Sequence, residues 1–312
     1  MSDRLWVVCA IANPMGFNSR MKLYRDFVQH VLADLRLNMV TVECSYGASE
    51  PELADVGRRF ETDGVRLVHV AVHANSIMWH KENLLNIACD HVPQGVPYIC
   101  WCDADLTFME GADAVPLMLR ALEAHPAVQC FSTCLDMGPG DASVLKVHHS
   151  YAKCSALGAA VRPGGFETAW HSGYVWAAHR SLLSRTGGLW DVGIVGSGDR
   201  VMALAFTGNV DEYKEKGFGA DYTGSMREWQ ARALEVTGGK VGYAPLTIMH
   251  HFHGSKKDRQ YGTRGAMLKA SVFSPAVDLV KNGDGVYEWA APSSELPGRV
   301  VQYFQDRRED AT

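Results

Sequence analysis

The feature that most constrains this chain is the alternation of short apolar runs with amphipathic stretches through its first half. The run at 5–12 (LWVVCAIA) is apolar throughout, as in strands that are covered on both faces. The stretch at 19–37 that follows places its apolar residues at helical spacing. Repeated strand–helix–strand order predicts right-handed crossovers and a mostly parallel sheet with helices on both faces. We therefore expect an α/β fold.

The same alternation continues to about residue 135 and then weakens. Further strands are expected at 38–44, 65–72, 96–102 and 128–134, and further helices at 79–89 and 113–125. The second half is less regular, with glycine pairs between a few helices. We expect residues 1–135 and 136–270 to be two halves of one domain, and residues 271–312 to be a C-terminal extension that packs on it.

Composition narrows the class of protein. The chain has 47% hydrophobic residues, as in an ordinary globular protein. Its net charge of −5 argues against extensive, non-specific binding of nucleic acid but allows a local basic patch. None of its eight cysteines forms a CxxC pair, so reduced and mostly buried thiols are expected rather than a structural zinc site. The run at 5–12 is too short for a secretory signal or a membrane span, so we expect a soluble protein without a membrane partner.

Two carboxylates stand directly after the apolar run that ends at residue 102. Asp103 and Asp105 therefore lie at the carboxyl end of a predicted buried strand, where open parallel sheets bind their ligands. Mg²⁺ and Mn²⁺ are commonly held by one or two carboxylates together with phosphates and water. Such an ion neutralises a diphosphate leaving group. A surface acidic triplet is the alternative, and the position after a buried strand favours the metal site.

A histidine-rich segment and a basic run occur together in the second half. In an extended segment, His251 and His253 point the same way, and either one can complete a metal shell. A histidine packed at a strand end is the structural alternative. The cations that follow suit a diphosphate, with an ordinary solvated face as the alternative; they are Lys256, Lys257, Arg259 and Arg264.

Two further motifs are candidates for the acceptor side. His171, Gly173 and Tyr174 combine polar and aromatic groups with a glycine and suit the floor under a sugar ring. Asp199 precedes the helix-like run 201–206, and an N-cap position alone would account for it. Its functional interpretation is a general base that removes a proton from an acceptor hydroxyl.

Taken together, these motifs resemble GT-A-fold glycosyltransferases of the family-2-like group. They follow the same order: a loop after the first strand, Lys and Asn before the DxD, the DxD, a Gly-rich acidic motif and a final histidine motif. In this chain they are 10–14, 79–86 (WHKENLLN), 103–105, 187–191 with 198–199, and 251–264 (HFHGSKKDRQYGTR). Three segments resemble glycosyltransferases of bacteriophages and large DNA viruses in particular. They are the motif at 251–264, the residues 42–43 with 46–47, and the ending Tyr303-Phe304 with Arg307, Glu309 and Asp310. The resemblance spans nearly the whole chain, and its specificity lies in the order of short motifs.

The resemblance implies a GT-A (Rossmann-like) catalytic domain over 1–270, with 1–135 binding a nucleotide-sugar and 136–270 supplying the acceptor side. It implies that Asn13 and Glu43 lie near the base and ribose, and Lys81 and Asn86 near the diphosphate or the sugar. Asp105, with His251 or His253, would hold Mn²⁺ or Mg²⁺, and Asp103 would contact the ribose or sugar as well as the ion. Asp199 would be the base of an inverting enzyme. Many inverting members carry Glu-Asp where this chain has Gly198-Asp199, which leaves inversion or retention open.

The expected function is thus a metal-dependent hexosyl- or pentosyltransferase, with a UDP-sugar favoured by the resemblance, in the cytoplasm of a bacterial or virus-infected host cell. The acceptor is either a hydroxymethylpyrimidine in phage DNA, with the basic residues 256–269 at its phosphates, or a glycan. A nucleotidyltransferase would need a Gly-rich loop with Lys or Arg directly after the first strand, which 13–17 (NPMGF) lacks. A non-catalytic sugar- or nucleotide-binding module needs no combination of carboxylates, base and cations. The oligomeric state is not predicted.

Overall fold

A seven-stranded mixed sheet forms the centre of the computed structural model, which describes residues 4–53, 55–56, 64–158, 170–213, 217–291 and 295–310. Its strands are β1 (Leu5–Ala12), β2 (Asn38–Tyr46), β3 (Leu67–Ala74), β4 (Tyr98–Cys102), β6 (Ala127–Gln129), β10 (Val175–His179) and β11 (Gly242–Tyr243). Their spatial order is β11-β6-β10-β4-β1-β2-β3. β1 runs parallel to β2 and β4, and β2 to β3, while β10 runs antiparallel to β4 and β6. The expected mostly parallel α/β sheet is confirmed, with one reversed strand.

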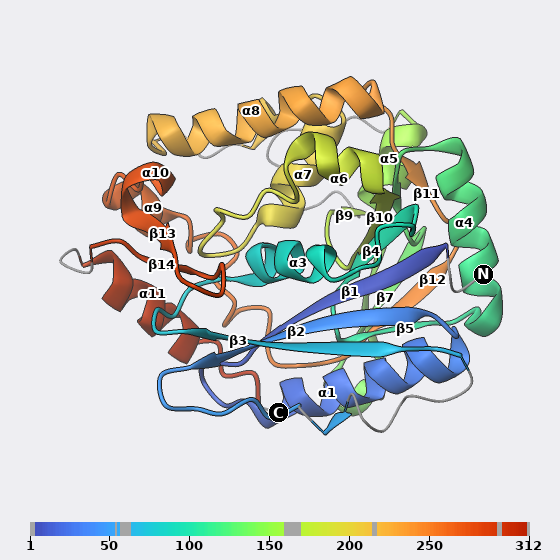
Figure 1. Ribbon diagram of the computed structural model, residues 1–312, viewed down its shortest axis with the longest axis horizontal. Coiled ribbons are helices and arrows are strands. Elements are labelled where there is room, and N and C mark those ends of the chain that lie inside the picture. Colours follow the sequence, from blue (N-terminus) through green and yellow to red (C-terminus); the bar gives the residue numbers. More distant parts are fainter. Residues whose placement is uncertain are drawn as a thin grey trace.

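Helices cover both faces of this sheet (Figure 1). One face packs against α3 (Lys81–Asp90), α6 (Arg180–Thr186) and α7 (Gly198–Phe206), and α8 (Ala220–Thr237) lies on the outside of α6 and α7. The other face packs against α1 (Asn18–Gln29), the π-helical turn His30–Asp34 and α4 (Ala114–Ala124). In β1, Trp6 and Val8 point into the first core, and Leu5, Val7 and Cys9 point into the second. The strand is apolar along its length because both of its faces are buried.

A second, five-stranded sheet has the order β5-β12-β7-β8-β9. Its strands are β5 (Leu106–Phe108), β12 (Thr247–His250), β7 (Thr133–Met137), β8 (Val144–Ser150) and β9 (Trp170–His171). The single strand expected at 128–134 is therefore wrong. The chain leaves the main sheet after β6 and enters the second sheet at β7, so that the apolar run is divided between two sheets. The smaller helical elements are α5 (Tyr151–Ala156) and the 3-10 turns Gly111–Asp113, Pro139–Asp141 and Val210–Glu212.

The C-terminal segment packs back onto the first half of the chain. It contains α9 (Ala266–Ala270), α10 (Pro275–Asp278), the hairpin β13 (Leu279–Lys281) and β14 (Tyr287–Trp289), and α11 (Leu296–Gln305). The Asp310 carboxylate accepts hydrogen bonds from the backbone N–H groups of Asn18 and Ser19 at 2.9 and 2.8 Å, at the start of α1. Figure 1 shows the C-terminus beside this helix. The expected boundaries, with two halves over 1–270 and an extension over 271–312, stay a prediction.

The cysteines and the helices bear on two further expectations. All eight cysteines are free thiols, and six of them are buried, which confirms the prediction of mostly buried thiols. Across the described ranges, the structure contains no helix with the length and apolar character needed to cross a membrane.

Candidate active site

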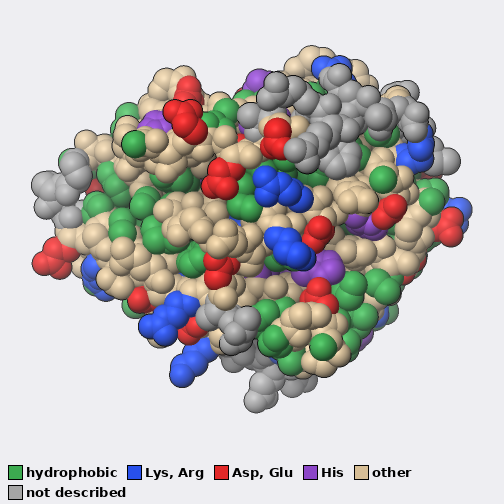
Figure 2. Space-filling view, turned by 90° about the horizontal axis from the view of Figure 1, so that it is seen from below, with side chains coloured by type: hydrophobic (Ala, Val, Ile, Leu, Met, Phe, Trp, Pro, Cys, Tyr) green, Lys and Arg blue, Asp and Glu red, His purple; other side chains and the backbone are tan. Residues whose placement is uncertain are grey.

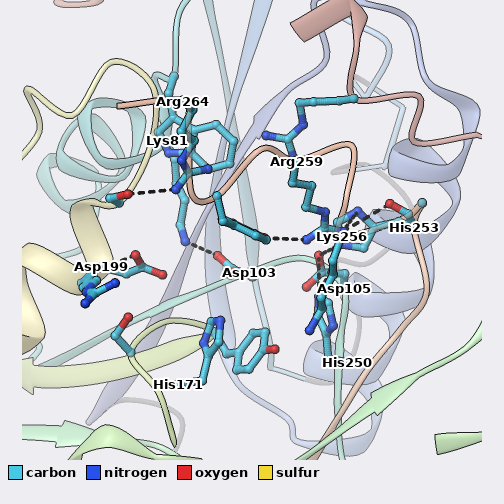
Figure 3. A pocket seen from close by; sticks show the side chains of 18 of the residues that line it. Lys81, Asp103, Asp105, His171, Asp199, His250, His253, Lys256, Arg259 and Arg264 are labelled. Carbon is cyan, nitrogen blue, oxygen red and sulfur yellow. Dashed lines mark hydrogen bonds and ion pairs between the residues drawn. The ribbon is translucent and has the colours of Figure 1, made fainter. Parts of the chain in front are cut away.

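A cavity of about 940 Å³ lies at the carboxyl ends of β1 and β4, at the upper end of the usual size range of ligand pockets. It brings together most of the candidate residues, which come from segments far apart in the sequence. The candidates that line it are Lys81, Asp103, Asp105, His171, Tyr174, Asp199, His251, His253, Lys256, Arg259 and Arg264. Figure 3 shows Asp105 with His250, His253, Lys256 and Arg259 on one side, and Lys81, Asp103, Asp199 and Arg264 on the other.

Asp105, His250 and His253 form the one group in the described residues whose ligand atoms converge as a metal site requires, all within 4.8 Å of one another. Asp105 Oδ2 lies 2.7 Å from His253 Nε2 and 3.6 Å from His250 Nε2. The pairing of β12 with β5 sets this geometry, because it places His250 opposite Leu106, next to Asp105. A hydrogen bond of 2.9 Å from the His251 N–H to the Asp105 carbonyl fixes the two segments beyond the last strand pair.

The chemistry of this group fits a divalent cation. Asp105 Oδ1 is buried without a hydrogen-bond partner in the described residues, although buried carboxylate oxygens are nearly always satisfied. Burial alone would raise the pKa of Asp105, but His250 and His253 hold it well below its usual range, so the carboxylate is charged. One carboxylate oxygen and two imidazole nitrogens are a donor set that suits Mn²⁺ and related transition metals.

The structure replaces His251 by His250 in this group. β12 ends at His250 and residues 251–253 belong to no strand, so strand pairing does not impose the alternation that would align 251 with 253. His251 points away, with Nδ1 at 2.7 Å from Asp141 Oδ2 and Nε2 at 2.8 Å from Thr107 Oγ1. His253 keeps its predicted place. Of the two histidines expected as alternative ligands, the structure therefore keeps His253 in the metal group and leaves His251 outside it.

Asp136, on β7, contacts His250 at the ring nitrogen that does not face Asp105. Its Oδ1 lies 2.7 Å from His250 Nδ1, so the carboxylate fixes the ring with Nε2 toward Asp105. The same carboxylate pairs with Lys256 and lies 3.5 Å from His148 Nε2. Lys256 thus has a carboxylate partner inside the protein, and its predicted diphosphate contact stays a prediction.

Asp103 lies on the Lys81 side of the cavity and is turned toward Asp105 and its partners (Figure 3). Its carboxylate pairs with Lys81, from the first turn of α3, and its backbone N–H donates to the Tyr174 carbonyl at 2.9 Å. Tyr174 has φ +76°, a left-handed conformation that costs a non-glycine residue about 1–3 kcal/mol and is concentrated at functional sites. Its ring stacks on His171 with centroids 3.9 Å apart. The residues predicted to form a sugar floor are thus a stacked pair that also positions the DxD turn.

Two buried guanidinium groups in the cavity have no carboxylate partner within the described ranges. Arg259 and Arg264 are each 7% exposed. Arg259 contacts His253 Nδ1 at 2.9 Å, and Arg264 donates to Ser197 Oγ at 2.9 Å and to Tyr303 Oη at 3.2 Å. The Nε of each arginine is buried and has no hydrogen-bond partner in the part of the chain that the structure describes. Buried charges are normally paired, so these two suit an anionic ligand.

Asp199 faces the cavity from the first turn of α7. The helix begins at Gly198 with Ser197 at the N-cap, so Asp199 lies inside the helix and not at the N-cap as expected. Its Oδ1 accepts from the N–H of Arg200 at 2.8 Å. Its Oδ2 lies 2.0 Å from the position that a Cβ on Gly173 would occupy, so Gly173 is needed as a glycine to leave room for this carboxylate.

Three of the residues predicted from the resemblance do not line the cavity. Asn13 bonds with both its side-chain atoms to the backbone of Phe17 at 2.9 and 3.0 Å, closing the turn after β1. Glu43 accepts from two loop amides at 2.7 and 3.1 Å and contacts His69 at 2.8 Å. Asn86 binds the backbone of Leu189 at 2.7 and 3.0 Å. These polar side chains satisfy the protein's own backbone, and the structure does not bring them to the site.

Sequence reasoning missed several residues that the structure brings to the cavity. His250 belongs to the histidine segment, but an extended segment through 251–253 would turn its side chain away from those of His251 and His253, whereas β12 ends at His250. Asp136 carries no local motif, because its partner His250 is more than a hundred residues away. Phe304 and Arg307 line the cavity from the C-terminal segment, where Arg307 lies over the ring of Trp79 at 4.9 Å. Both residues belong to the C-terminal motif of the resemblance, which implies no role for them.

No family model and no curated protein matches this sequence. Among solved structures, the chain is similar to the mannosyltransferase PcManGT from Pyrobaculum calidifontis in complex with GDP-Man and Mn²⁺, with a TM-score of 0.45 and 17% identity over 96% of this chain and 69% of that one. It is also similar to residues 1–349 of TarS from S. aureus, with a TM-score of 0.41 and 9% identity over 99% and 72% of the two chains. A third similar structure is the glycosyltransferase GlyE of Streptococcus pneumoniae TIGR4, with a TM-score of 0.40 and 12% identity over 97% and 60%.

Proposed function

We propose that this protein is a metal-dependent GT-A-type glycosyltransferase that transfers a sugar from a nucleotide-diphosphate sugar to an acceptor hydroxyl. The observation that carries the proposal is the convergence of Asp105, His250 and His253 in one cavity with two buried arginines that have no carboxylate partner among the described residues. A site that holds a divalent cation beside unpaired guanidinium groups suits a diphosphate ligand.

In this proposal each group of residues has a separate role, which follows from its place in the cavity. Asp105, His250 and His253 hold Mn²⁺ or Mg²⁺, which supplies charge neutralisation for the departing diphosphate. Arg259 and Arg264 bind diphosphate oxygens. Asp103 and Lys81, which pair with each other, orient the ribose or sugar.

The acceptor side lies around Asp199. This carboxylate takes the proton of the attacking hydroxyl, and the stacked rings of His171 and Tyr174 lie under the sugar. A base in this position favours inversion at the anomeric carbon. The donor sugar, hexose or pentose, is left to the assay below.

A glycan or another hydroxyl compound fits the acceptor better than duplex DNA. Arg259 and Arg264 are buried in the cavity, so they do not offer their charges to a DNA backbone on the surface. Figure 2 shows acidic and basic side chains interspersed on the face that it presents, and not a continuous basic surface. Binding to duplex DNA that weakens steeply between about 50 and 200 mM salt would contradict this choice of acceptor.

The test of the proposed function is a donor panel of UDP-glucose, UDP-galactose, GDP-mannose and the pentose donor UDP-xylose with Mn²⁺, Mg²⁺ or EDTA. Release of the nucleoside diphosphate is measured, with water as the acceptor. We expect release from at least one donor with Mn²⁺ and none with EDTA or in Asp105→Asn. Release that persists in EDTA refutes the metal-dependent mechanism, and release of pyrophosphate from a nucleoside triphosphate would point to nucleotidyl transfer instead.

A further inference from the structure

Glu82 is a cavity-lining carboxyl that the proposed function leaves without a role. It lies in the first turn of α3 and is 3% exposed. Apart from its own backbone amide, its carboxyl has no hydrogen-bond or ion-pair partner among the described residues, because the neighbouring Lys81 pairs with Asp103. A buried carboxyl that the fold does not satisfy is a candidate for contact with a ligand.

The backbone of α7 makes room for this carboxyl beside Asp199. A Cβ placed on Gly198 would lie 2.5 Å from Glu82 Cδ and 2.6 Å from Glu82 Oε1. Glu82 therefore occupies the space that a side chain at 198 would take, directly before Asp199 in the chain. Asp199 in turn packs against Gly173. Two glycines thus allow two carboxyls to approach the same end of the cavity.

The surroundings of Glu82 favour proton uptake near neutral pH. Burial raises the pKa of Glu82 to about 7; Lys81 opposes this shift, while Asp199 and Asp103 add to it. These three residues are the charged groups that face Glu82, from α3, from α7 and from the turn after β4. The Arg264 guanidinium interacts through its charge with the nearby carboxylate of Asp199.

We propose that Glu82 is a further substrate-contacting carboxyl, which forms with Asp199 a pair that accepts the proton of the acceptor hydroxyl. The proposal rests on the proposed glycosyl transfer. The acceptor oxygen bonds to the anomeric carbon, the bond from that carbon to the diphosphate oxygen breaks, and its electron pair leaves with the diphosphate. The hydroxyl proton passes to the carboxyl pair, which returns it to water after product release. Neighbouring carboxyls share one proton readily because their like charges disfavour double ionisation.

The first test is the pH dependence of nucleoside diphosphate release from GDP-mannose or UDP-galactose. The pair must be free to accept a proton, so the wild-type rate rises with pH through about 7 and then levels off. Glu82→Gln loses this rise and lowers turnover about 100-fold or more. Asp199→Asn also lowers turnover, and moves the remaining rise to lower pH, because its charge no longer raises the pKa of Glu82. Glu123→Gln, an exposed change on α4, keeps the wild-type profile.

A second variant tests whether the position of the Glu82 carboxyl matters as well as its presence. Gly198→Ala keeps the Glu82 carboxyl but displaces it, and α7 should form at least as well with alanine. We expect a loss of turnover similar to that of Glu82→Gln, and no additional loss in the double variant. Additive losses would contradict a shared cause.

Two readouts keep this proposal distinguishable from the proposed function. Carboxyl-carbon NMR of protein labelled at glutamate Cδ should show one resonance that titrates near pH 7 and is absent from Glu82→Gln. Glu82→Gln should still be stabilised by GDP or UDP with Mn²⁺, because Glu82 does not contact the diphosphate.

Normal turnover and an unchanged pH profile in Glu82→Gln, or a Glu82 resonance with an ordinary pKa, overturns the Glu82 proposal alone. Failure of the wild type to bind any nucleoside diphosphate with Mn²⁺ overturns the donor site instead.

Discussion

His250 and His251 are neighbours in the chain, but they face different carboxylates. His250 Nε2 faces Asp105, and His251 Nδ1 faces Asp141. Their side chains point to opposite sides, as successive residues of a strand do, at the place where β12 ends. The two histidines therefore provide a direct comparison at the scale of single residues.

Replacement of each histidine by alanine tests the ligand assignment. His250→Ala removes one of three converging ligands, and we expect Mn²⁺ affinity to fall by more than about 100-fold, since even partners outside the coordination shell contribute about 10–100-fold. His251→Ala should retain most of the affinity. Free Mn²⁺ measured by electron paramagnetic resonance distinguishes the two, and the opposite ranking would restore His251 as the ligand.

Asp136 and Asp141 form a matched pair for the supporting carboxylate. Each lies 2.7 Å from a histidine Nδ1, Asp136 at His250 and Asp141 at His251. Asp136→Asn should weaken Mn²⁺ binding about 10–100-fold, because the ring of His250 loses its orienting acceptor. Asp141→Asn should leave it nearly unchanged. Equal affinities for the two variants would show that Asp136 does not position His250.

Gly173 tests the placement of Asp199. In Gly173→Ala the new Cβ meets Asp199 Oδ2 at 2.0 Å, so the carboxylate must move and donor turnover should fall at least about 10-fold, the equivalent of about 1.4 kcal/mol. Gly224→Ala, on α8, is the control, because nothing lies within 4 Å of its Cβ and the helix should gain about 0.5–1 kcal/mol. Unchanged turnover in Gly173→Ala would remove Asp199 from the reaction.

At the scale of elements, the sequence indicated where the site begins but not what completes it. The apolar run before Asp103 predicted a buried strand and hence the DxD turn at its carboxyl end, and β4 ends at Cys102 as that argument requires. The second sheet was not predicted, because β7, β8 and β12 are short and their pairing is set by contacts distant in the chain. Asp136 and Glu82 could not be selected for the same reason, since the residues that give them a place in the site, His250 and Asp199, come from other elements.

The C-terminal segment is held by an element-scale contact that can be measured. Glu309 is 2% exposed and pairs with Arg20 at 2.6 Å and with Arg307 at 2.6 Å. Glu309→Gln leaves these cations without their carboxylate and should lower the free energy of unfolding by about 3–5 kcal/mol in urea. Glu123→Gln breaks an exposed pair with Arg4 and should cost at most about 1 kcal/mol. Similar losses in the two variants would contradict a structural role for the buried pair.

At the scale of the whole molecule, the two sheets and the C-terminal segment enclose one cavity. The main sheet supplies the DxD turn, the second sheet supplies His250 and Asp136, and the C-terminal segment adds Phe304 and Arg307. The α/β class and the mostly parallel sheet followed from the apolar runs, because their continuity reflects burial on both faces. The enclosure of the cavity depends on contacts between both ends of the chain, which no local pattern encodes.

The central claim is that one site binds a divalent cation and a nucleoside diphosphate together. Its most direct measurement is thermal unfolding with UDP, GDP, CDP or TDP, each with and without Mn²⁺. We predict that at least one nucleotide raises the Tm when Mn²⁺ is present, by the equivalent of about 2.7 kcal/mol at 100 times its Kd, and that EDTA or Asp105→Asn abolishes the effect. Stabilisation by free sugar alone, or by nucleotide equally well in EDTA, would contradict the account.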